Sequence, residues 1–440
     1  IWKANLAPPQ FMNMIDLRPL SIPQYSAILT RMNEKKFPDG FYWGAATASY
    51  QVEGGIDNCD WAKAAREERV PVCGQACDHY HRYETDFDIA KSLGHTAHRF
   101  SIEWARIEPE EGKFNQEAVA HYRNVLLALH ARDIKPFVTL WHFTLPLWFS
   151  ESGGFERADS PEIFARYCAF VVKELGDLCE YFSTQNEPNV VGSNGWLRGT
   201  WPPFKRFALT DLVSITNSGK SYEPRSQRGF KPLFLYMRVM KNLALSHNAA
   251  YIAIKKVSPN IEVSVVKHTI VFDSNWNPVN KLKAAIANYA WTRIYMSRVK
   301  KHVDSIGLNY YFYTKFGDKR RWRKTDMDWN FAPEHIYDAL KMLSVYKVPL
   351  FVSEAGIADA DDSDRAEYIQ KQVQATWQAI QDGIDVRGHM YWSLLDNYEW
   401  ALGFEKRFGL VEIDYNTLER RIRPSAYVYK DICQHNAVLE

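Results

Sequence analysis

The sequence predicts an α/β fold, a single-domain (β/α)8 TIM barrel, from three observations. From Phe37 onward, short apolar, β-branched or aromatic runs alternate with longer helical segments, and this alternation occurs eight times. No run is followed by the Gly-rich phosphate turn that is typical of a doubly wound sheet. Barrels of this kind often exceed the average domain length, so 440 residues fit one unit. An open doubly wound sheet is the alternative, but it usually has fewer strands.

The candidate strands share a high content of β-branched and aromatic residues, which pack well on a pleated sheet. Strand–helix alternation implies parallel strands joined by right-handed crossovers. The eight candidate strands lie at residues 41–52, 96–107, 136–143, 181–187, 262–270, 305–313, 349–354 and 388–395.

The segments between the strands have helical periodicity or helix-start signals. Val119, Leu126 and Leu129, for example, fall on one face of a helix. Pro161 suits a helix N-terminus because the N–H that proline lacks would be unpaired there. The predicted helices cover residues 85–93, 116–131, 161–175, 233–257 and 363–380.

The chain is predicted to contain one barrel domain and one terminal extension. Residues 1–36 contain several prolines and no sustained period, so they are interpreted as an N-terminal extension. Residues 37–440 form the predicted barrel, which would carry any catalytic site. Two long segments, 190–230 and 271–300, are expected to be insertions at the barrel rim.

The composition excludes several classes of protein. The chain has 54 Lys and Arg against 52 Asp and Glu, which excludes a strongly basic nucleic-acid binder and an acidic disordered tail. No stretch approaches the roughly 18 consecutive apolar residues of a membrane span, so no membrane partner is expected. The N-terminus lacks a signal-peptide pattern, which favours a cytoplasmic location. The sequence does not indicate an oligomeric state.

The cysteines do not favour a disulfide framework or a metal site. Six Cys in 440 residues are too few for a disulfide scaffold. Cys73 and Cys77, with His79 and His81 nearby, suggest zinc, but no matching second pair of ligands follows. Free thiols in an intracellular protein are therefore the preferred interpretation, with no metal ion and no organic cofactor.

Two carboxylates stand at the ends of predicted strands. Glu187 ends the fourth and Glu354 ends the seventh. Either one alone could be a solvated surface residue. In a (β/α)8 barrel, however, the carboxyl ends of the strands form one face, which carries the catalytic residues. Paired carboxylates across a glycosidic bond are the usual machinery of glycoside hydrolysis.

Other strand ends carry amides, aromatic rings and charged groups that suit a hydroxyl-rich ligand. Each also has a purely structural interpretation. His142 could be a hydrogen-bonded core histidine, Arg99 could pair with Glu103, and the aromatic residues could belong to the core. The candidate residues are Gln51, Arg99, His142, Asn186, Asn309, Tyr311, Trp392, Glu399 and Trp400.

Several of these motifs resemble glycoside hydrolase family one. They are Asn186-Glu187-Pro188, Ser353-Glu354-Ala355-Gly356, the segment 37–48 and the block 392–400. The resemblance runs from about residue 37 to residue 431, and the motifs occur in the family's order. It implies a (β/α)8 barrel with retaining β-glycosidase activity.

The resemblance also implies a role for each residue. Glu187 would be the general acid/base and Glu354 the nucleophile. Arg99, Asn309 and Tyr311 would keep the nucleophile ionised and aligned. Burial or the second carboxylate should raise the pKa of Glu187, which must carry a proton. The residues implied to bind the sugar are Gln51, His142, Asn186, Trp392, Glu399 and Trp400.

The sequence departs from the family in two places. Ala355 stands where the nucleophile motif usually has Asn, so an amide contact near Glu354 is missing or supplied elsewhere. The loop after Glu53 is short, and with the segment 141–146 it resembles the archaeal-type branch.

Three functions remain open at this stage. The first is an exo-acting retaining β-glycosidase that releases glucose, galactose or fucose from a small β-glycoside or oligosaccharide. The second is a transglycosylase that uses the same covalent intermediate. The third is a sugar-binding or interaction protein with an impaired site.

Overall fold

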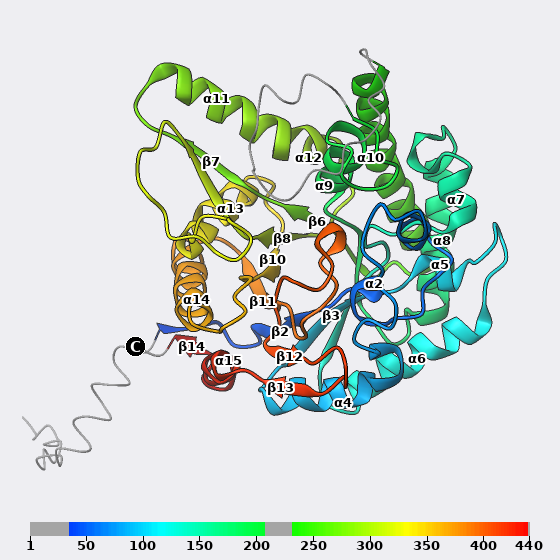
Figure 1. Cartoon of the computed structure of the whole chain (residues 1–440), viewed down its shortest axis with the longest axis horizontal. Helices are drawn as coiled ribbons and strands as arrows, with labels where there is room; N and C mark the ends of the chain where they lie inside the picture. The colour runs from blue at the N-terminus through cyan, green and yellow to red at the C-terminus, as the bar shows by residue number, and fades with distance from the viewer. Residues whose placement is uncertain (1–34, 207–230, 439–440) are drawn as a thin grey trace, which may run out of the picture.

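A computed structural model describes residues 35–206 and 231–438. Its centre is a closed barrel of parallel strands in the order β10-β11-β2-β3-β4-β5-β6-β8 (Figure 1). The predicted (β/α)8 barrel is therefore confirmed. The barrel strands are β2 Tyr42–Ala46, β3 Ala97–Ser101, β4 Lys135–Thr139, β5 Tyr181–Asn186, β6 Glu262–His268, β8 Ser305–Tyr310, β10 Leu350–Ala355 and β11 Val386–Trp392.

All eight predicted runs overlap a barrel strand, but several runs are too long. The run 41–52 divides into β2 and the short helix α2, Ser49–Val52. The run 96–107 divides into β3 and α5, Trp104–Ile107. All of α2 and most of α5 are buried, as the strands before them are, and elements of four residues are too short for periodicity to distinguish helix from strand.

Helices surround the barrel, as the sequence predicts. Helix α6 begins where Asn115 accepts hydrogen bonds from the N–H groups of Glu117 and Ala118, which is a side-chain N-cap. The longer helices are α4 His79–Ser92, α6 Gln116–His130, α8 Ser160–Leu175, α10 Lys231–Val257, α13 Ile336–Ser344, α14 Arg365–Gln381 and α15 Pro424–His435. Helix α11, Pro278–Asn288, is also among the longer ones, and shorter helices are α3 Asp60–Arg66, α7 Leu147–Glu151, α9 Pro188–Gly192 and α12 Ile294–Val299.

The segment 271–300 is only partly the rim insertion that was expected. Strand β7, Val271–Ser274, pairs in parallel with β9, Tyr313–Phe316, outside the barrel. The chain then continues through α11, a π-helical turn and α12 back to β8. Most of this segment is therefore the crossover between two neighbouring barrel strands. In the segment 190–230, residues 207–230 lie outside the described residues.

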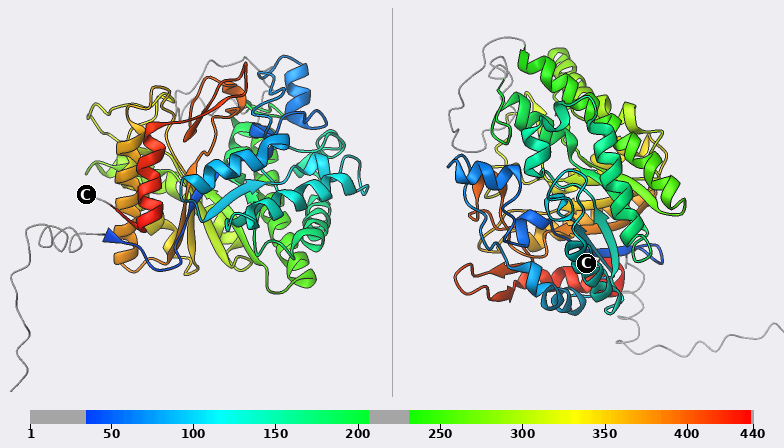
Figure 2. Two further views of the ribbon diagram at one scale, coloured as in Figure 1. Left: turned by 90° about the horizontal axis from the view of Figure 1, so that it is seen from below. Right: turned by 90° about the vertical axis from the view of Figure 1, so that its right-hand side faces the viewer.

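The two ends of the barrel domain are joined. Strand β1, Lys35–Lys36, pairs antiparallel with β14, Ala437–Val438. The Trp377 side chain of α14 donates to the Lys36 carbonyl at 2.9 Å, which places β1 beside that helix (Figure 2). The described fold thus begins two residues before the predicted boundary at 37, and residues 1–34 lie outside the described part. A further small hairpin pairs β12 Val411–Ile413 with β13 Arg420–Ile422.

The cysteines and histidines that suggested zinc are engaged in other contacts. Cys73 and Cys77 are buried thiols that donate to the backbone carbonyls of Tyr50 and Asp396. His79 contacts Asp86 at 2.7 Å. Within residues 35–206 and 231–438, no helix is both long enough and apolar enough to cross a membrane.

Candidate active site

Glu187 and Glu354 both lie at the carboxyl ends of barrel strands, and each strand is irregular just before its carboxylate. The β5–β6 register shifts between Ser183 and Asn186, and the β10–β8 register shifts between Val352 and Glu354. Such irregularities add a residue on one strand and change the direction of the next side chain. As a result, Ser353 and Glu354 both make contacts inside the barrel, although strict alternation would turn one of them away.

Glu354 is buried and held by two donors. Arg99 on β3 donates to Glu354 Oε1 at 2.5 Å, and the Tyr311 hydroxyl donates to Oε2 at 2.6 Å. Arg99 also donates to Thr139 and to Asn186, so its guanidinium is fixed in place. The alternative pairing of Arg99 with Glu103 is not formed. Both oxygens of the Glu354 carboxylate therefore have a hydrogen-bond donor.

Glu187 is equally buried but has a different environment. Its backbone has φ 45° and ψ 54°, a left-handed conformation that is rare for a residue with a side chain. Asn309 donates to Glu187 Oε1 at 2.6 Å. Burial, followed by the negative charge of Glu354, raises the pKa of Glu187 to about 8. Near neutrality Glu187 therefore carries a proton, as a general acid requires.

Asn309 was expected to align Glu354, but its hydrogen bond goes to Glu187. It donates to Glu187 and, at 3.2 Å, to Asn186 Oδ1. The Ser353 hydroxyl donates to Asn309 Oδ1 at 2.8 Å, which fixes the orientation of the amide. Ser353, the residue before the nucleophile candidate, is thus connected through Asn309 to the acid/base candidate, a link that the sequence did not indicate.

The unusual Ala355 lies outside this network. It is fully buried and belongs to the main apolar core. The next residue, Gly356, has no room for a side chain, since a Cβ there would lie 1.9 Å from the Trp392 carbonyl oxygen. The contacts that hold Glu354 come from Arg99 and Tyr311, so the missing amide removes none of the contacts described above.

An aromatic cluster borders the carboxylates. The His142 ring lies nearly parallel to the rings of Trp392 and Trp400, with centroids 6.0 and 6.1 Å away and interplanar angles of 15° and 12°. Burial and the nearby Arg99 lower the pKa of His142 well below its ordinary range, so the ring is neutral. Its Nε2 lies 3.2 Å from Asn186 Nδ2, and its buried Nδ1 has no partner among the described residues.

Gln51, like His142, has one buried polar atom without a hydrogen-bond partner among the described residues. Its Nε2 donates to Asn397 Oδ1 and to the Tyr398 carbonyl, while its Oε1 is buried without a partner in the described part of the chain. Buried polar atoms are nearly always hydrogen-bonded in native proteins. Orphan atoms on Gln51 and His142 therefore indicate a place for a polar ligand such as a sugar hydroxyl.

Glu399 is a third acidic group near the cluster. Burial, together with the negative charge of Glu354, raises the pKa of Glu399 to about 8. Its neighbour Trp400 is buried and also packs against Phe143, at 4.9 Å between ring centroids. Trp400 thus lies in the same cluster as His142, and Glu399 directly precedes it in the chain.

The sequence analysis missed Lys267 on β6. Its side chain is fully buried, and Nζ donates to the His268 carbonyl at 2.6 Å and lies 5.5 Å from the Trp291 ring centroid. Its positive charge acts to lower the pKa of Glu187, opposing the two causes given above. The available signal was a lysine within an otherwise apolar strand, which is rare without a function or partner.

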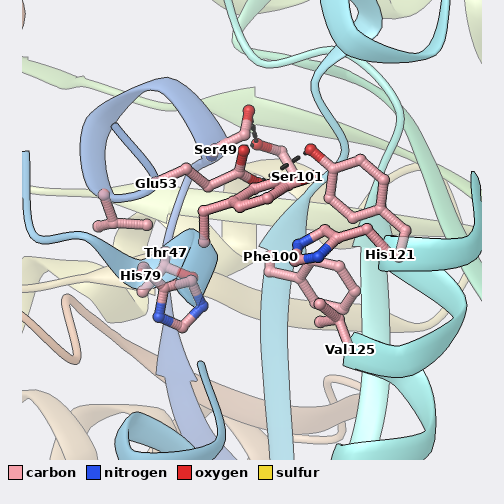
Figure 3. A pocket seen from close by; sticks show the side chains of 11 residues that line it. Thr47, Ser49, Glu53, His79, Phe100, Ser101, His121 and Val125 are labelled. Carbon is pink, nitrogen blue, oxygen red and sulfur yellow. Dashed lines mark hydrogen bonds between the residues drawn. The ribbon is translucent and has the colours of Figure 1, made fainter. Parts of the chain in front are cut away.

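A small polar cavity lies beside the site, between the barrel and the outer helices (Figure 3). Ser49 and Ser101 face each other there, and the Tyr122 hydroxyl donates to Glu53 Oε1 at 2.9 Å. Ser101 also accepts from the Ser49 backbone N–H. These bonds anchor both ends of α2, the helix that carries Gln51, so the cavity lining serves to position that residue.

Comparisons with known proteins agree with this geometry. The family model described as glycosyl hydrolase family 1 matches residues 33–292 and 277–438. The chain is 32% identical to β-glucosidase A from Acetivibrio thermocellus, with 92% of this chain and 100% of the relative covered.

Solved structures give the same result. A β-glycosidase from Pyrococcus horikoshii matches with a TM-score of 0.82 and 35% identity, covering 92% of this chain and 97% of that one. A β-glucosidase from Thermotoga maritima in complex with glucoimidazole matches with a TM-score of 0.82 and 29% identity, covering 91% and 99%. The resemblance found in the motifs is confirmed: the chain belongs to glycosyl hydrolase family 1 and is a glycoside hydrolase.

Proposed function

We propose that this chain is a retaining exo-β-glycosidase that hydrolyses terminal β-D-glucosides by double displacement. The observation that carries the proposal is the asymmetry of the two buried carboxyl groups. Glu354 receives hydrogen bonds from Arg99 and Tyr311, whereas burial and the charge of Glu354 keep the proton on Glu187. One group is thus a ready nucleophile and the other a ready acid.

In the first step, Glu354 attacks the anomeric carbon and the glycosidic bond breaks. Glu187 transfers its proton to the departing oxygen, so the aglycone leaves as a neutral alcohol. The product is an ester between the sugar and Glu354, which no longer carries a charge. The pKa of Glu187 therefore falls, because one of the two causes that raised it has disappeared.

In the second step, Glu187 acts as a base. It accepts a proton from a water molecule as the oxygen of that water attacks the anomeric carbon. The bond to Glu354 breaks, and the carboxylate returns to Arg99 and Tyr311. Two inversions at the same carbon give net retention of configuration.

The sugar would occupy the space bordered by the aromatic cluster. The unpartnered atoms of Gln51 and His142 suit hydrogen bonds to ring hydroxyls, and Trp392 offers an apolar surface for one sugar face. Asn186, which Arg99 orients, would bond the 2-hydroxyl, and Glu399 with Trp400 would bind the 4- and 6-hydroxyls. Because Glu399 can serve either epimer at position 4, glucosides and galactosides are both candidate substrates.

The test measures release of nitrophenol from an aryl β-D-glucoside by the native chain and by Glu354→Ala. We expect kcat to fall ~10⁴-fold or more, because the covalent route is lost. Added azide should restore part of the rate and give the α-glycosyl azide, since a small anion can occupy the space left by the carboxylate. An unchanged rate in the variant, or a β-configured azide product, would refute Glu354 as the nucleophile.

A panel of galactosides and fucosides with the same leaving group defines the sugar preference. If the native chain turns over none of the three sugars while the folded barrel is intact by circular dichroism, the hydrolase assignment of this site is wrong. The impaired sugar-binding protein would then be the better interpretation.

A further inference from the structure

Helix α11, Pro278–Asn288, turns Asn280 and Asn288 towards the protein and its large apolar side chains towards solvent. Asn288 accepts from the Phe272 backbone N–H and donates to the Phe272 carbonyl at 2.7 Å. Asn280 donates to Asn275 at 3.0 Å. Ala284 is the only buried residue of this helix. A surface helix normally shows the opposite arrangement, with apolar residues inward.

Five exposed residues define the outward surface, which we call the docking face. Trp276 is 83% exposed, Val279 60%, Leu282 61%, Ile286 59% and Tyr289 59%. The last four recur at intervals of three or four residues, so they form one stripe along α11 and the turn that follows it. Figure 1 shows α11 at the outer edge of the molecule, with α12 and α10 beyond its end. Apolar stripes of this kind on a soluble surface mark interaction sites.

Basic residues predominate around the docking face, and Asp273 on the adjoining strand β7 is paired with Lys315. Between Asp273 and Asp304 the chain carries six Lys and Arg and no acidic residue. Lys281 and Lys283 are both exposed, and at about 100° per residue they lie on either side of the apolar stripe. Helix α10 packs against α12 and also has five Lys and Arg without an acidic residue. The chain as a whole is nearly neutral, so this charge is strongly localised.

We propose that the docking face binds the surface of an anionic lipid bilayer, with α11 lying in the plane of the interface. An apolar stripe with a large aromatic residue, flanked by lysines, is the pattern of interfacial helices. A second copy of this chain fits less well, because a two-fold contact would bring two basic faces together. No membrane partner was expected from the sequence, because no stretch is long enough to span a bilayer. The proposed binding needs no such stretch, since the helix lies on the membrane surface.

The experiment measures co-sedimentation of the full chain with vesicles of phosphatidylcholine alone or with added phosphatidylglycerol. We expect binding to the anionic vesicles only, weakened by salt. Leu282→Ser with Ile286→Ser should reduce the partition coefficient ~10-fold or more through lost apolar burial. Lys281→Gln with Lys283→Gln should reduce it by a similar factor. Val345→Ser, at a residue 59% exposed elsewhere, is the matched control and should change nothing.

Hydrolysis of a soluble aryl glucoside should be unchanged in all of these variants, which shows that each one is folded. Binding to neutral vesicles with equal strength, or no binding to either kind, would overturn the proposal. So would binding to soluble heparin that the serine substitutions leave intact, since that would indicate a polyanion site. Concentration-dependent dimers in sedimentation velocity that the serine substitutions abolish would assign the face to a second copy.

Discussion

The two ends of the barrel are built from the same strands but differ in the side chains that they bury: apolar at the amino ends, polar and charged at the carboxyl ends. Near the amino ends, Phe137, Phe351 and Met390 form an apolar cluster with Tyr42 and Tyr181. The Phe137 and Tyr181 rings stack at 4.4 Å, and Phe137 meets Phe351 at 5.2 Å. The side chains of this cluster are aromatic or aliphatic, and the tyrosines at its edge are only partly buried. Its contribution is to the stability of the barrel.

At the carboxyl ends, the same strands carry buried acids, amides and one buried lysine. Each of these groups loses hydration on folding, and Glu187 is also held in a left-handed conformation, which costs on the order of 1–3 kcal/mol. The difference teaches that the carboxyl end of the barrel is arranged for a reaction and loses stability as a result. The apolar cluster at the amino end compensates for this loss. Substitutions at the two ends should therefore change different measured quantities.

The largest expected effect separates the acid from the nucleophile. In Glu187→Gln, the side chain keeps its volume and can still accept from Asn309, but it cannot donate the catalytic proton. For a phenyl glucoside, whose leaving group needs that proton, we expect kcat/KM to fall ~10²–10⁴-fold. For a dinitrophenyl glucoside the loss should be much smaller. Rates that fall equally for both leaving groups would contradict the assignment of Glu187.

The next prediction concerns the opposite end of the barrel. Phe351→Ala removes the centre of the apolar cluster and should lower the free energy of unfolding by about 3–5 kcal/mol. Equilibrium unfolding in urea gives this quantity. Activity per folded molecule should stay close to that of the native chain, because no catalytic contact involves this ring. A selective loss of kcat at unchanged stability would break the proposed division between the two ends.

The fold was largely predictable because the alternation of apolar strand-like runs with longer helical segments is visible in the sequence. The strand ends were not, since α2 and α5 are as buried as the strands before them. The carboxylate pair was visible from its position, but alternation alone would have placed Ser353 and Glu354 on opposite faces. The irregular registers of β5 and β10 arise from pairing with other strands, and no local pattern records them.

Individual contacts were harder to predict than the site itself. Asn309 was placed near the nucleophile, yet it contacts Glu187, because that contact depends on how β5 and β8 are staggered around the barrel. Lys267 was overlooked since a lysine near a strand end usually reaches solvent. Its burial depends on Trp291, which follows α11 and is distant in sequence.

A smaller effect tests the cost of the catalytic end directly. The folded-state pKa of Glu187 is raised to about 8, above the ordinary value near 4.5, so the unfolded chain ionises this group more easily. The native chain should therefore lose stability as pH rises from about 4.5 to about 8. Glu187→Gln removes this loss and should gain on the order of 1–3 kcal/mol at pH 7.5, and almost nothing at pH 4.5. Urea unfolding at the two pH values measures the difference, and a destabilised variant at pH 7.5 would contradict the account.

The smallest effect concerns Lys267, the cation that opposes the raised pKa of Glu187. Lys267→Met keeps the apolar stem over Trp291 and removes the charge. The pKa of Glu187 should rise further, because the lowering effect of Lys267 is lost while those of the Asn309 hydrogen bond and of Arg99 remain. The alkaline limb of kcat/KM, where the acid loses its proton, should move upward by up to about one pH unit. Lys315→Met, which removes a half-buried cation paired with Asp273 at the rim, is the control and should leave the limb in place. If the limb does not move in a folded Lys267→Met variant, the lysine is neutral at working pH, and its burial alone has removed its charge from the site.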